Sequence, residues 1–263
     1  MEKLKNFIWN RSPQDAYRNP YEYKAQEQFV REAFKVLDAI KIQFEKFNRI
    51  FTRDDVSLEK AIWMLQLDAT DSLIGCLELL VTKKHKVAGR LIRDTVEVLD
   101  LSAYFSIENE KSKNSLKKWY RNEVIPNREY RDFVKTNISL EKAEELKLVY
   151  SQLSKFNHRT YKSLAYGYIL GKDNKLVYDG FSNSNSLIYP GVISMYYSLL
   201  ANMIQLLAYE AIERKLLKKE VVENIWEESI EEEPINRKYI TPEEVFKNFI
   251  SKKTSNDKVK NSY

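Results

Sequence analysis

Apolar residues recur three and four positions apart through several long stretches of this sequence, and few Gly or Pro residues interrupt them. The first stretch runs from about residue 24 to residue 51 and has the stripe of an amphipathic helix. Only 6 Gly and 6 Pro occur in 263 residues, which disfavours the turn-dense chains of β-sandwiches and β-barrels. The sequence therefore predicts an all-α fold.

Five such stretches predict a helical bundle of about five long helices, with short accessory helices. The long helices cover about residues 24–51, 57–83, 86–107, 139–168 and 190–217. Ser57 is placed to be the N-cap of the second helix, and only a short break separates that helix from the third, so we expect the two to pack as an antiparallel hairpin. The last helix is apolar nearly all round, which predicts the most buried position and suggests a surface for a homodimer.

The rest of the chain is organised around this bundle. We expect an N-terminal arm at 1–23, the bundle at 24–217, accessory helices, the first of them acidic, at 218–250, and a disordered basic tail at 251–263. A loop rich in Gly, Ser and Asn separates the last two long helices. Within it, Asp173-Asn174 is placed to close a small hairpin between residues 168–170 and 176–178.

Composition argues against several classes of enzyme. A single cysteine, Cys76, leaves no intramolecular disulfide, and two histidines, His85 and His158, leave at most a poor metal site. Motifs for nucleoside triphosphates, dinucleotides, zinc proteases and serine hydrolases do not occur. We therefore expect no metal and no cofactor. Cys76 is expected to be a small buried hydrophobe, and His85, which stands among lysines, a solvated residue.

The sequence also gives expectations about location. No segment reaches the roughly 18 uninterrupted apolar residues of a membrane span, and the first residues lack the apolar region of a secretory signal. A cytoplasmic protein with no membrane partner is expected. The net charge of +5 is too small to indicate nucleic-acid binding by itself, so the local distribution of charge matters more.

The most basic stretch is residues 111–135, with eight Lys or Arg against three Asp or Glu. Aromatic residues, among them Trp119, Tyr120 and Tyr130, are interleaved with these charges. Such a stretch can bind nucleic acid through phosphate contacts and base stacking. Charged helices with aromatics on the inner face have the same pattern, so both interpretations stay open.

The predicted third helix carries Arg90, Arg93, Asp94 and Glu97 on one side, and the Arg–carboxylate pairs stand at i,i+4. One interpretation is an exposed charged face. The other is an anion or phosphate clamp at the edge of a groove. Tyr104 continues this side with apolar surface, so we expect its second half to be covered.

Carboxylates also interrupt the predicted second helix. Asp68 and Asp71 are about one turn apart, and Glu78 follows. We expect them to be solvated or paired with Lys and Arg, with a carboxylate metal site as a minor option.

On the predicted fourth helix, Asn157 lies at the margin of the apolar stripe and His158 lies outside it. A histidine among Asn, Arg and Tyr side chains can act as a general acid or base near neutral pH. A histidine that caps a loop or pairs with a neighbouring helix is the alternative interpretation.

Three segments together resemble a known family. They are KHKVAGRLIRDTVE at 84–97, LKKWY at 116–120 and YSQLSKFNH at 150–158. They resemble bacterial all-helical proteins with an Arg-x-x-x-Glu helix and a later LS-x-x-x-H helix, which are similar to the HEPN superfamily. The resemblance covers roughly residues 30 to 215.

What this resemblance implies is a bundle in which Arg93 with Glu97, and Asn157 with His158, face a shared groove. Active HEPN proteins are metal-independent ribonucleases that use an Arg and a His of one helix. By this resemblance His158 is the acid or base, Arg93 the phosphate clamp and Glu97 the residue that orients it. The expected substrate-binding residues are Arg90, Lys155, Asn157, Arg159 and Tyr161.

The sequence departs from the family pattern, because Lys155 is the only cation shortly before His158. Arg90 or Arg93 would then supply the cation from another helix. The expected function is that of an RNA-directed protein, as a metal-independent endoribonuclease of bacterial defence or toxin type. The alternative is a non-catalytic helical module that binds a protein or RNA partner.

Overall fold

The computed structural model describes most of the predicted bundle. The described residues are 22–82, 84–107, 109–130, 168–170, 175–178 and 189–231, with the single positions Ser151, Ser154, Tyr161 and Asp173. The predicted arm up to residue 21, most of the predicted helix at 139–168 and everything beyond residue 231 lie outside them. Within the predicted fourth helix, the three described positions, Ser151, Ser154 and Tyr161, are helical.

The first helix, α1 (Glu22–Glu45), ends earlier than the sequence predicts. Its apolar stripe is buried in the core, at Phe29, Ala33, Leu37, Ile40 and Phe44. Beyond the helix the chain turns, with Arg49 at a φ of 71°. The indole N–H of Trp63 donates to the carbonyl of Phe44 at 2.9 Å, which helps to satisfy the last turn of α1. Because Trp63 belongs to the next helix, the apolar spacing within α1 does not predict this contact.

The predicted N-cap of α2 (Leu58–Val81) is confirmed. The Ser57 hydroxyl accepts the backbone N–H of Lys60 at 3.2 Å, so one of the donors left over at the helix start is satisfied. The dipole at this end also favours Glu59 in the first turn.

The next helix, α3 (His85–Phe105), packs against α2 as the predicted antiparallel hairpin. Near the connection, the Cys76 thiol donates to the carbonyl of Ala88 at 3.6 Å. Farther away, the Gln66 amide donates to the Ser102 hydroxyl at 3.4 Å. Since earlier residues of α2 meet later residues of α3, the two helices run in opposite directions.

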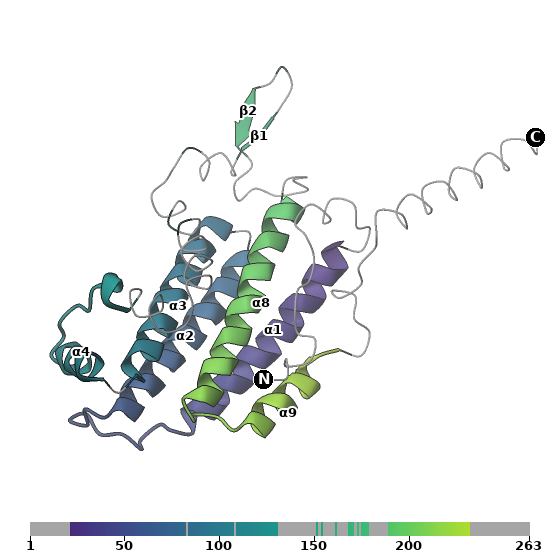
Figure 1. Ribbon diagram of the computed structural model, residues 1–263. Helices are drawn as coiled ribbons and strands as arrows, with labels where there is room; N and C mark the ends of the chain where they lie inside the picture. The colour runs from purple at the N-terminus through teal and green to yellow at the C-terminus, as the bar shows by residue number, and fades with distance from the viewer. Residues whose placement is uncertain are drawn as a thin grey trace, which may run out of the picture.

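Helix α8 (Tyr189–Glu213) contacts α1, α2 and α3 (Figure 1). Its buried core residues are Ile193, Tyr196, Tyr197, Leu200, Ala201, Met203, Ile204, Leu207, Ala208 and Ala211. The homodimer on this helix that the sequence suggests stays a prediction. Although α8 is strongly apolar, none of the helices in the described part of the chain combines the length and hydrophobicity that crossing a bilayer requires.

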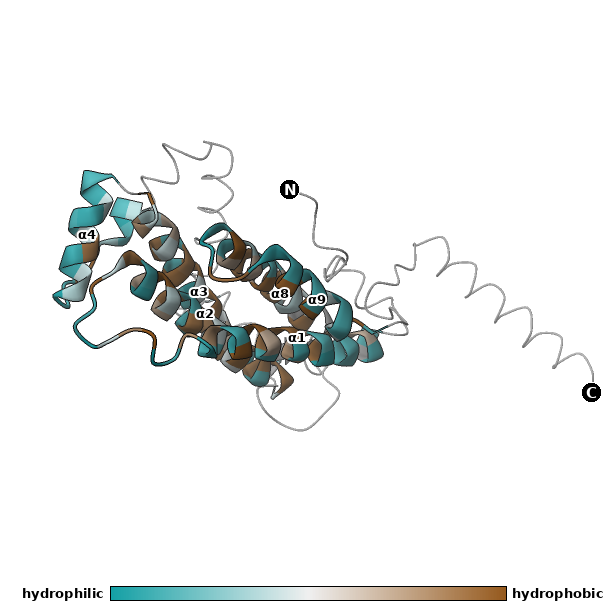
Figure 2. Ribbon diagram, turned by 90° about the horizontal axis from the view of Figure 1, so that it is seen from below, coloured by the Kyte–Doolittle hydropathy of each residue, from teal (hydrophilic) through white to brown (hydrophobic). Residues whose placement is uncertain are grey.

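The acidic helix α9 (Lys219–Ser229) returns to the bundle and contacts α1 and α8. Its apolar side faces them and its charged side faces outward (Figure 2). Val222, Ile225 and Trp226 belong to the same core as the long helices. Burial of these side chains explains why an acidic segment folds back on the bundle.

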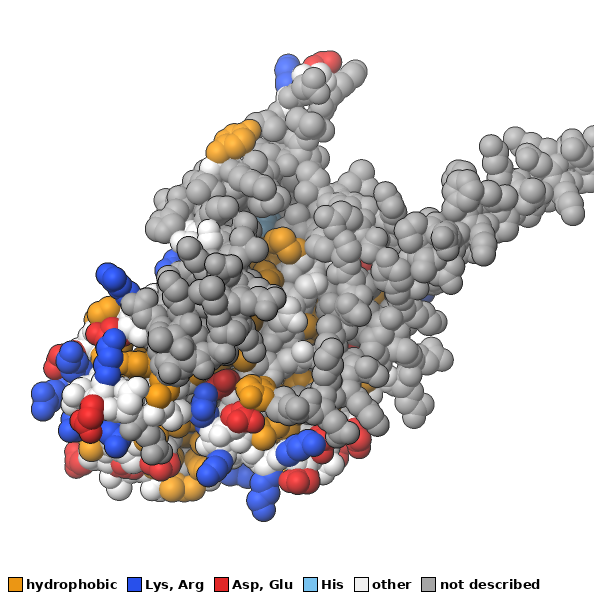
Figure 3. Space-filling model, in the orientation of Figure 1, with side chains coloured by type: hydrophobic (Ala, Val, Ile, Leu, Met, Phe, Trp, Pro, Cys, Tyr) orange, Lys and Arg blue, Asp and Glu red, His pale blue; other side chains and the backbone are white. Residues whose placement is uncertain are grey.

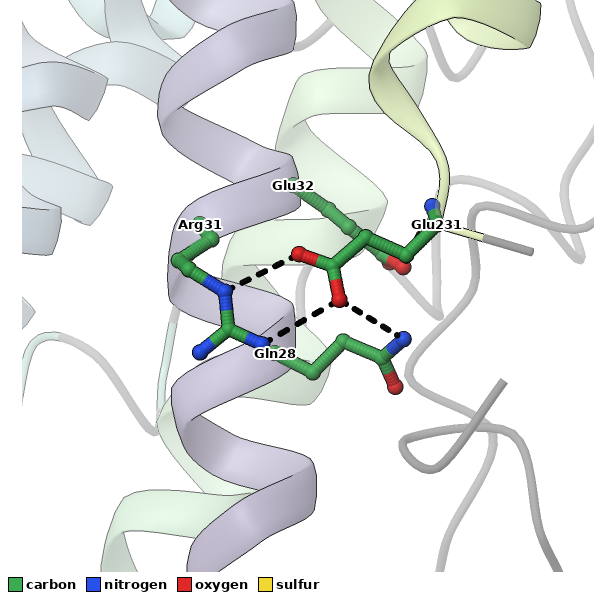
Figure 4. Close-up of polar contacts among 4 residues, drawn as sticks. All are labelled: Gln28, Arg31, Glu32 and Glu231. Atoms are coloured by element: carbon green, nitrogen blue, oxygen red, sulfur yellow. Dashed lines mark hydrogen bonds and ion pairs between the residues drawn. The ribbon is translucent and has the colours of Figure 1, made fainter. Parts of the chain in front are cut away.

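The chain just beyond α9 is fastened to α1 by polar contacts (Figure 4). Arg31 donates to both carboxylate oxygens of Glu231, at 2.9 and 3.1 Å. The Gln28 amide donates to one of those oxygens at 3.3 Å, and the backbone N–H of Glu231 donates to the Glu32 carboxylate at 3.2 Å.

Helix α4 (Glu110–Tyr120) covers the second half of α3 from one side. It closes a second, smaller core made by Ala61, Leu65, Tyr104, Phe105, Ile125 and Tyr130. The predicted cover over Tyr104 is therefore present, and this side chain is only 1% exposed.

A small hairpin lies where the sequence predicts one. Strand β1 (Tyr168–Leu170) pairs antiparallel with β2 (Leu176–Tyr178), and Ile169 stands opposite Val177. Asp173, in the connection, has a φ of 60°, a left-handed conformation that Asp tolerates better than most residues. Apart from this pair of strands, the described elements are helices, so the fold is an all-α bundle.

Candidate functional site

The charged side of α3 contains one of the two predicted ion pairs. The Nε of Arg93 donates to Oε1 of Glu97 at 3.0 Å, and the side chains are 21% and 25% exposed. Because both residues lie one helical turn apart on α3, the helix itself sets their geometry. Glu97 thereby holds the guanidinium in one orientation in a partly desolvated position, and its own charge offsets part of the positive charge of Arg93.

The second predicted pair does not form. Arg90 is exposed, and no ion pair joins it to Asp94 within the described part of the chain. Burial raises the pKa of Asp94, and the nearby Glu97 and Asp68 raise it further, whereas Arg93 lowers it. Burial also raises the pKa of Asp68, with a smaller contribution from Asp71. Glu97 and Asp94 thus lie near Arg93, and Arg90 adds exposed positive charge one turn away.

The structure does not place the other predicted catalytic group. His158 lies outside the described residues, as do Lys155, Asn157 and Arg159. Tyr161 is described and is 81% exposed, so its ring is accessible to a ligand. The predicted convergence of α3 with the His158 segment therefore stays a prediction.

The prediction for His85 is wrong. We expected a solvated side chain because lysines surround it in the sequence, but His85 is only 3% exposed. It is the first residue of α3, and its ring packs at 5.9 Å from the ring of Tyr196 on α8. Gly89, one turn later, lets the tyrosine approach, since a Cβ there would lie 3.2 Å from its ring. The approach of α8 buries this histidine, and a local charge pattern cannot report that approach.

The prediction for Cys76 is confirmed. The side chain is fully buried between α2 and α3, and burial raises the pKa of the thiol well above its ordinary value. A neutral, inaccessible thiol is a poor nucleophile. Cys76 therefore acts as a small packing residue.

The carboxylates of α2 are used as surface charges. Asp71 forms an ion pair of 2.7 Å with Lys41 of α1. Over the ranges that the structure describes, no three or more His, Cys, Asp or Glu side chains gather in a way that could hold a metal ion.

The basic stretch agrees with the interpretation of a charged helix with aromatics on its inner face, and nucleic-acid binding stays a prediction. The rings of Trp119 and Tyr120 turn toward the second core, where Trp119 packs edge-on at 5.9 Å from Phe105. Lys117 and Lys118 are exposed beside them. Figure 3 shows Lys and Arg side chains, mixed with acidic and apolar ones, over the end of the molecule that carries α4.

An open groove of about 670 Å³, which the sequence does not predict, borders these aromatic residues. Arg53 from the α1–α2 connection and Lys60 from α2 line it together with Trp119 and Tyr120. One signal was present, because Lys60 occupies the position where a capping box would have Glu. What that lysine contacts depends on the preceding loop.

Comparisons of this chain with protein-family models, with curated proteins and with solved structures found no match.

Proposed function

We propose that this chain is an RNA-directed endoribonuclease that works without a metal ion, with Arg93 and Glu97 as its phosphate clamp and His158 as its proton-transfer group. The observation that supports the proposal is the contact of 3.0 Å between Arg93 and Glu97. A guanidinium held in one orientation and four-fifths covered is preorganised for a phosphate oxygen. Glu97 is a positioning residue, because it acts through Arg93.

The reaction that fits these groups is transesterification at an RNA phosphodiester. The 2′-hydroxyl loses its proton as its oxygen attacks phosphorus. The bond from phosphorus to the 5′-oxygen breaks, and this leaving oxygen takes up a proton. The products are a 2′,3′-cyclic phosphate and a 5′-hydroxyl. His158 transfers one of the two protons and solvent water the other, and Arg93 balances the charge that develops on the phosphate oxygens.

The negative charge near Arg93 means that the phosphate clamp needs a second positive charge. Glu97 and Asp94 place negative charge near the guanidinium, which opposes a phosphate. Arg90 stands three residues before Arg93, so both lie on neighbouring turns of one side of α3. Its exposed side chain supplies the second positive charge of the clamp.

Cleavage of a single-stranded RNA by the full chain in the presence of EDTA tests this proposal. We expect His158→Ala and Arg93→Ala each to lower the rate by about 100-fold or more. Arg93→Lys should restore little, since an ammonium lacks the fork of the guanidinium. Glu97→Gln should lower the rate less, by about tenfold, because a neutral side chain still accepts a hydrogen bond.

Arg214→Ala is the matched control. Arg214 makes the same kind of i,i+4 contact with Glu210 on α8, at 3.0 Å, and its side chain is 23% exposed. Its loss should affect stability as the loss of Arg93 does and leave cleavage unchanged. Equal cleavage by wild type, His158→Ala and Arg93→Ala would refute the catalytic proposal. Absence of cleavage by the wild type would favour the non-catalytic binding module.

A further inference from the structure

The groove beside α4 has rigid walls. The ammonium of Lys60 donates to three backbone carbonyls of the α1–α2 connection, those of Thr52, Arg53 and Asp55, at 2.8, 2.9 and 2.7 Å. An ammonium has three donors, and all three are used here. The contacts fix the loop that presents Arg53 at the groove.

The opposite wall is fixed by the end of α4. The Tyr120 hydroxyl donates to the carbonyl of Ser57 at 2.7 Å, which ties α4 to the start of α2. After the helix, Asn122 has a φ of 63°, and the N–H groups of Asn122 and Glu123 donate to the carbonyls of Trp119 and Lys118. This pattern is a Schellman motif, and Asn is one of the few residues that accept its left-handed position. Both walls of the groove are therefore held by hydrogen bonds within the chain.

The groove presents an apolar and aromatic surface. Met64, Trp119 and Val124 line it, and Val124 is 90% exposed. Trp119 is half-buried, and its ring makes T-shaped contacts with Phe105 at 5.9 Å and with Tyr120 at 5.1 Å between ring centroids. A half-buried ring on a fixed wall is suited to stacking against a flat apolar group such as a nucleobase.

Positive charge leads along α4 to this groove. Lys113, Lys117 and Tyr120 are spaced by four and three residues, which places them along one side of the helix. Tyr120 lines the groove, so this side of α4 ends there. The two lysines are exposed and form no ion pair within the described residues. Like charges at i,i+4 destabilise a helix of only 11 residues, and a polyanion lying along the row would relieve that repulsion.

The segment that contains α4 and the loop after it is also net positive. Residues 109–130 contain six Lys or Arg and three Glu. Arg53 adds an exposed cation on the opposite wall. A ligand that joins flat apolar groups to a chain of negative charges matches both features, and single-stranded nucleic acid has this chemistry.

We propose that the groove between α2 and α4 binds single-stranded RNA, with a base on Trp119 and backbone phosphates on Arg53, Lys117 and Lys113. This inference rests on the proposed function and deepens it, because it names single-stranded RNA as the substrate class. The groove binds the strand, and the clamp on α3 belongs to the cleavage step.

Fluorescence anisotropy of the full chain with a labelled RNA of about 10 nucleotides, a length typical of single-strand grooves, tests this proposal. The RNA carries 2′-O-methyl groups, so it cannot be cleaved through the 2′-oxygen. We expect Lys117→Glu and Arg53→Glu each to weaken binding by about tenfold and to reduce its salt dependence. Both side chains are exposed, so these variants should fold. Lys218→Glu, an exposed lysine before α9, is the matched control and should bind as the wild type does.

Several results would overturn the groove proposal. They are absence of binding by the wild type, equal binding by all variants, and equally tight binding of a duplex of the same sequence. Tighter binding of a poly-glutamate peptide than of RNA would assign the groove to an acidic protein partner. If the wild type binds RNA but does not cleave ordinary RNA, the groove proposal stands and the nuclease proposal is refuted. If Lys117→Glu and Arg53→Glu cleave RNA as fast as the wild type, the groove proposal is refuted and the nuclease proposal stands.

Discussion

Arg31 of α1 holds the carboxylate of Glu231 by two hydrogen bonds, although 200 residues of sequence separate them. The contact joins the segment after α9 to α1, the first helix of the bundle. The backbone N–H of Glu231 reinforces this contact by donating to the buried Glu32. The acidic end of α9 is thus joined to α1 by specific contacts.

The ion pair predicts a pH-dependent contribution to stability. The hydrogen bond from Arg31 lowers the pKa of Glu231, and the charge of Arg31 and the amide of Gln28 act in the same direction. A carboxylate with a lowered pKa in the folded state stabilises the protein above its unfolded pKa, and loses that contribution as the pH falls through the folded pKa. Glu231→Gln should lower the free energy of unfolding by about 0.5–1 kcal/mol at neutral pH, since the pair is partly exposed.

Urea denaturation at about pH 7 and about pH 3, on either side of the ordinary pKa of Glu, measures this contribution. The difference between wild type and Glu231→Gln should shrink at the lower pH. Glu223→Gln is the control, because its pair with Lys219 spans 3.4 Å with both side chains over 40% exposed, and its loss should change little. A difference that does not depend on pH would contradict the assignment.

The helical glycines Gly75 of α2 and Gly89 of α3 should respond differently to alanine. A Cβ on Gly75 would lie 3.4 Å from Leu91, an ordinary contact, so Gly75→Ala should stabilise the protein by about 0.5–1 kcal/mol through helix propensity. A Cβ on Gly89 would lie 3.2 Å from both the ring and the hydroxyl of Tyr196. Gly89→Ala should be less stable than Gly75→Ala by about 1 kcal/mol or more, because the buried ring of Tyr196 has to shift. Thermal denaturation compares them, and equal melting temperatures would refute the steric argument.

The end of α8 contains a residue in an unfavourable conformation. Lys215 has a φ of 59°, and the N–H of Leu216 donates to the carbonyl of Ala211 at 2.9 Å, which is the Schellman arrangement that favours Gly. Lys215→Gly should therefore stabilise the protein by about 0.5–1 kcal/mol. Lys218 has a φ of −77°, so Lys218→Gly should not stabilise it. Chemical denaturation decides, and stabilisation by both or by neither would count against the conformational explanation.

Lys60 should contribute strongly to stability, although most lysines are exposed and contribute little. The side chain is only 9% exposed, and it satisfies three loop carbonyls. Lys60→Met leaves these acceptors without their donor and should cost about 2–3 kcal/mol. Lys118→Met removes an exposed lysine of α4 and should be nearly neutral. A loss no larger than that of the control, measured by urea denaturation, would show that water replaces the ammonium.

Cys76 should report global unfolding. It is completely buried, and burial raises the pKa of its thiol, so the thiolate that reacts with iodoacetamide is scarce and shielded. Alkylation followed by mass spectrometry should therefore be slow in native buffer and complete in denaturing urea. Rapid alkylation of the native protein would mean that α2 and α3 separate easily near Cys76.

Local patterns were enough to place most of the bundle. The apolar spacing that buries Phe29 and Leu37 is set within one helix, and so are the N-cap at Ser57 and the contact of Arg93 with Glu97. Each of these features depends on residues three or four positions apart, so the sequence states it directly. The turn at Asp173 is equally local.

The sequence by itself thus determined the fold class, the approximate positions of the described helices and the contact of Arg93 with Glu97. Only the tertiary structure decided that His85 is buried, that α1 stops at Glu45, that α9 docks through Trp226 and that a groove opens beside Lys60. Each of these depends on segments that are distant in sequence. Burial and hydrogen bonding to such segments are set by packing, and periodicity within a single helix does not encode which surface will cover it.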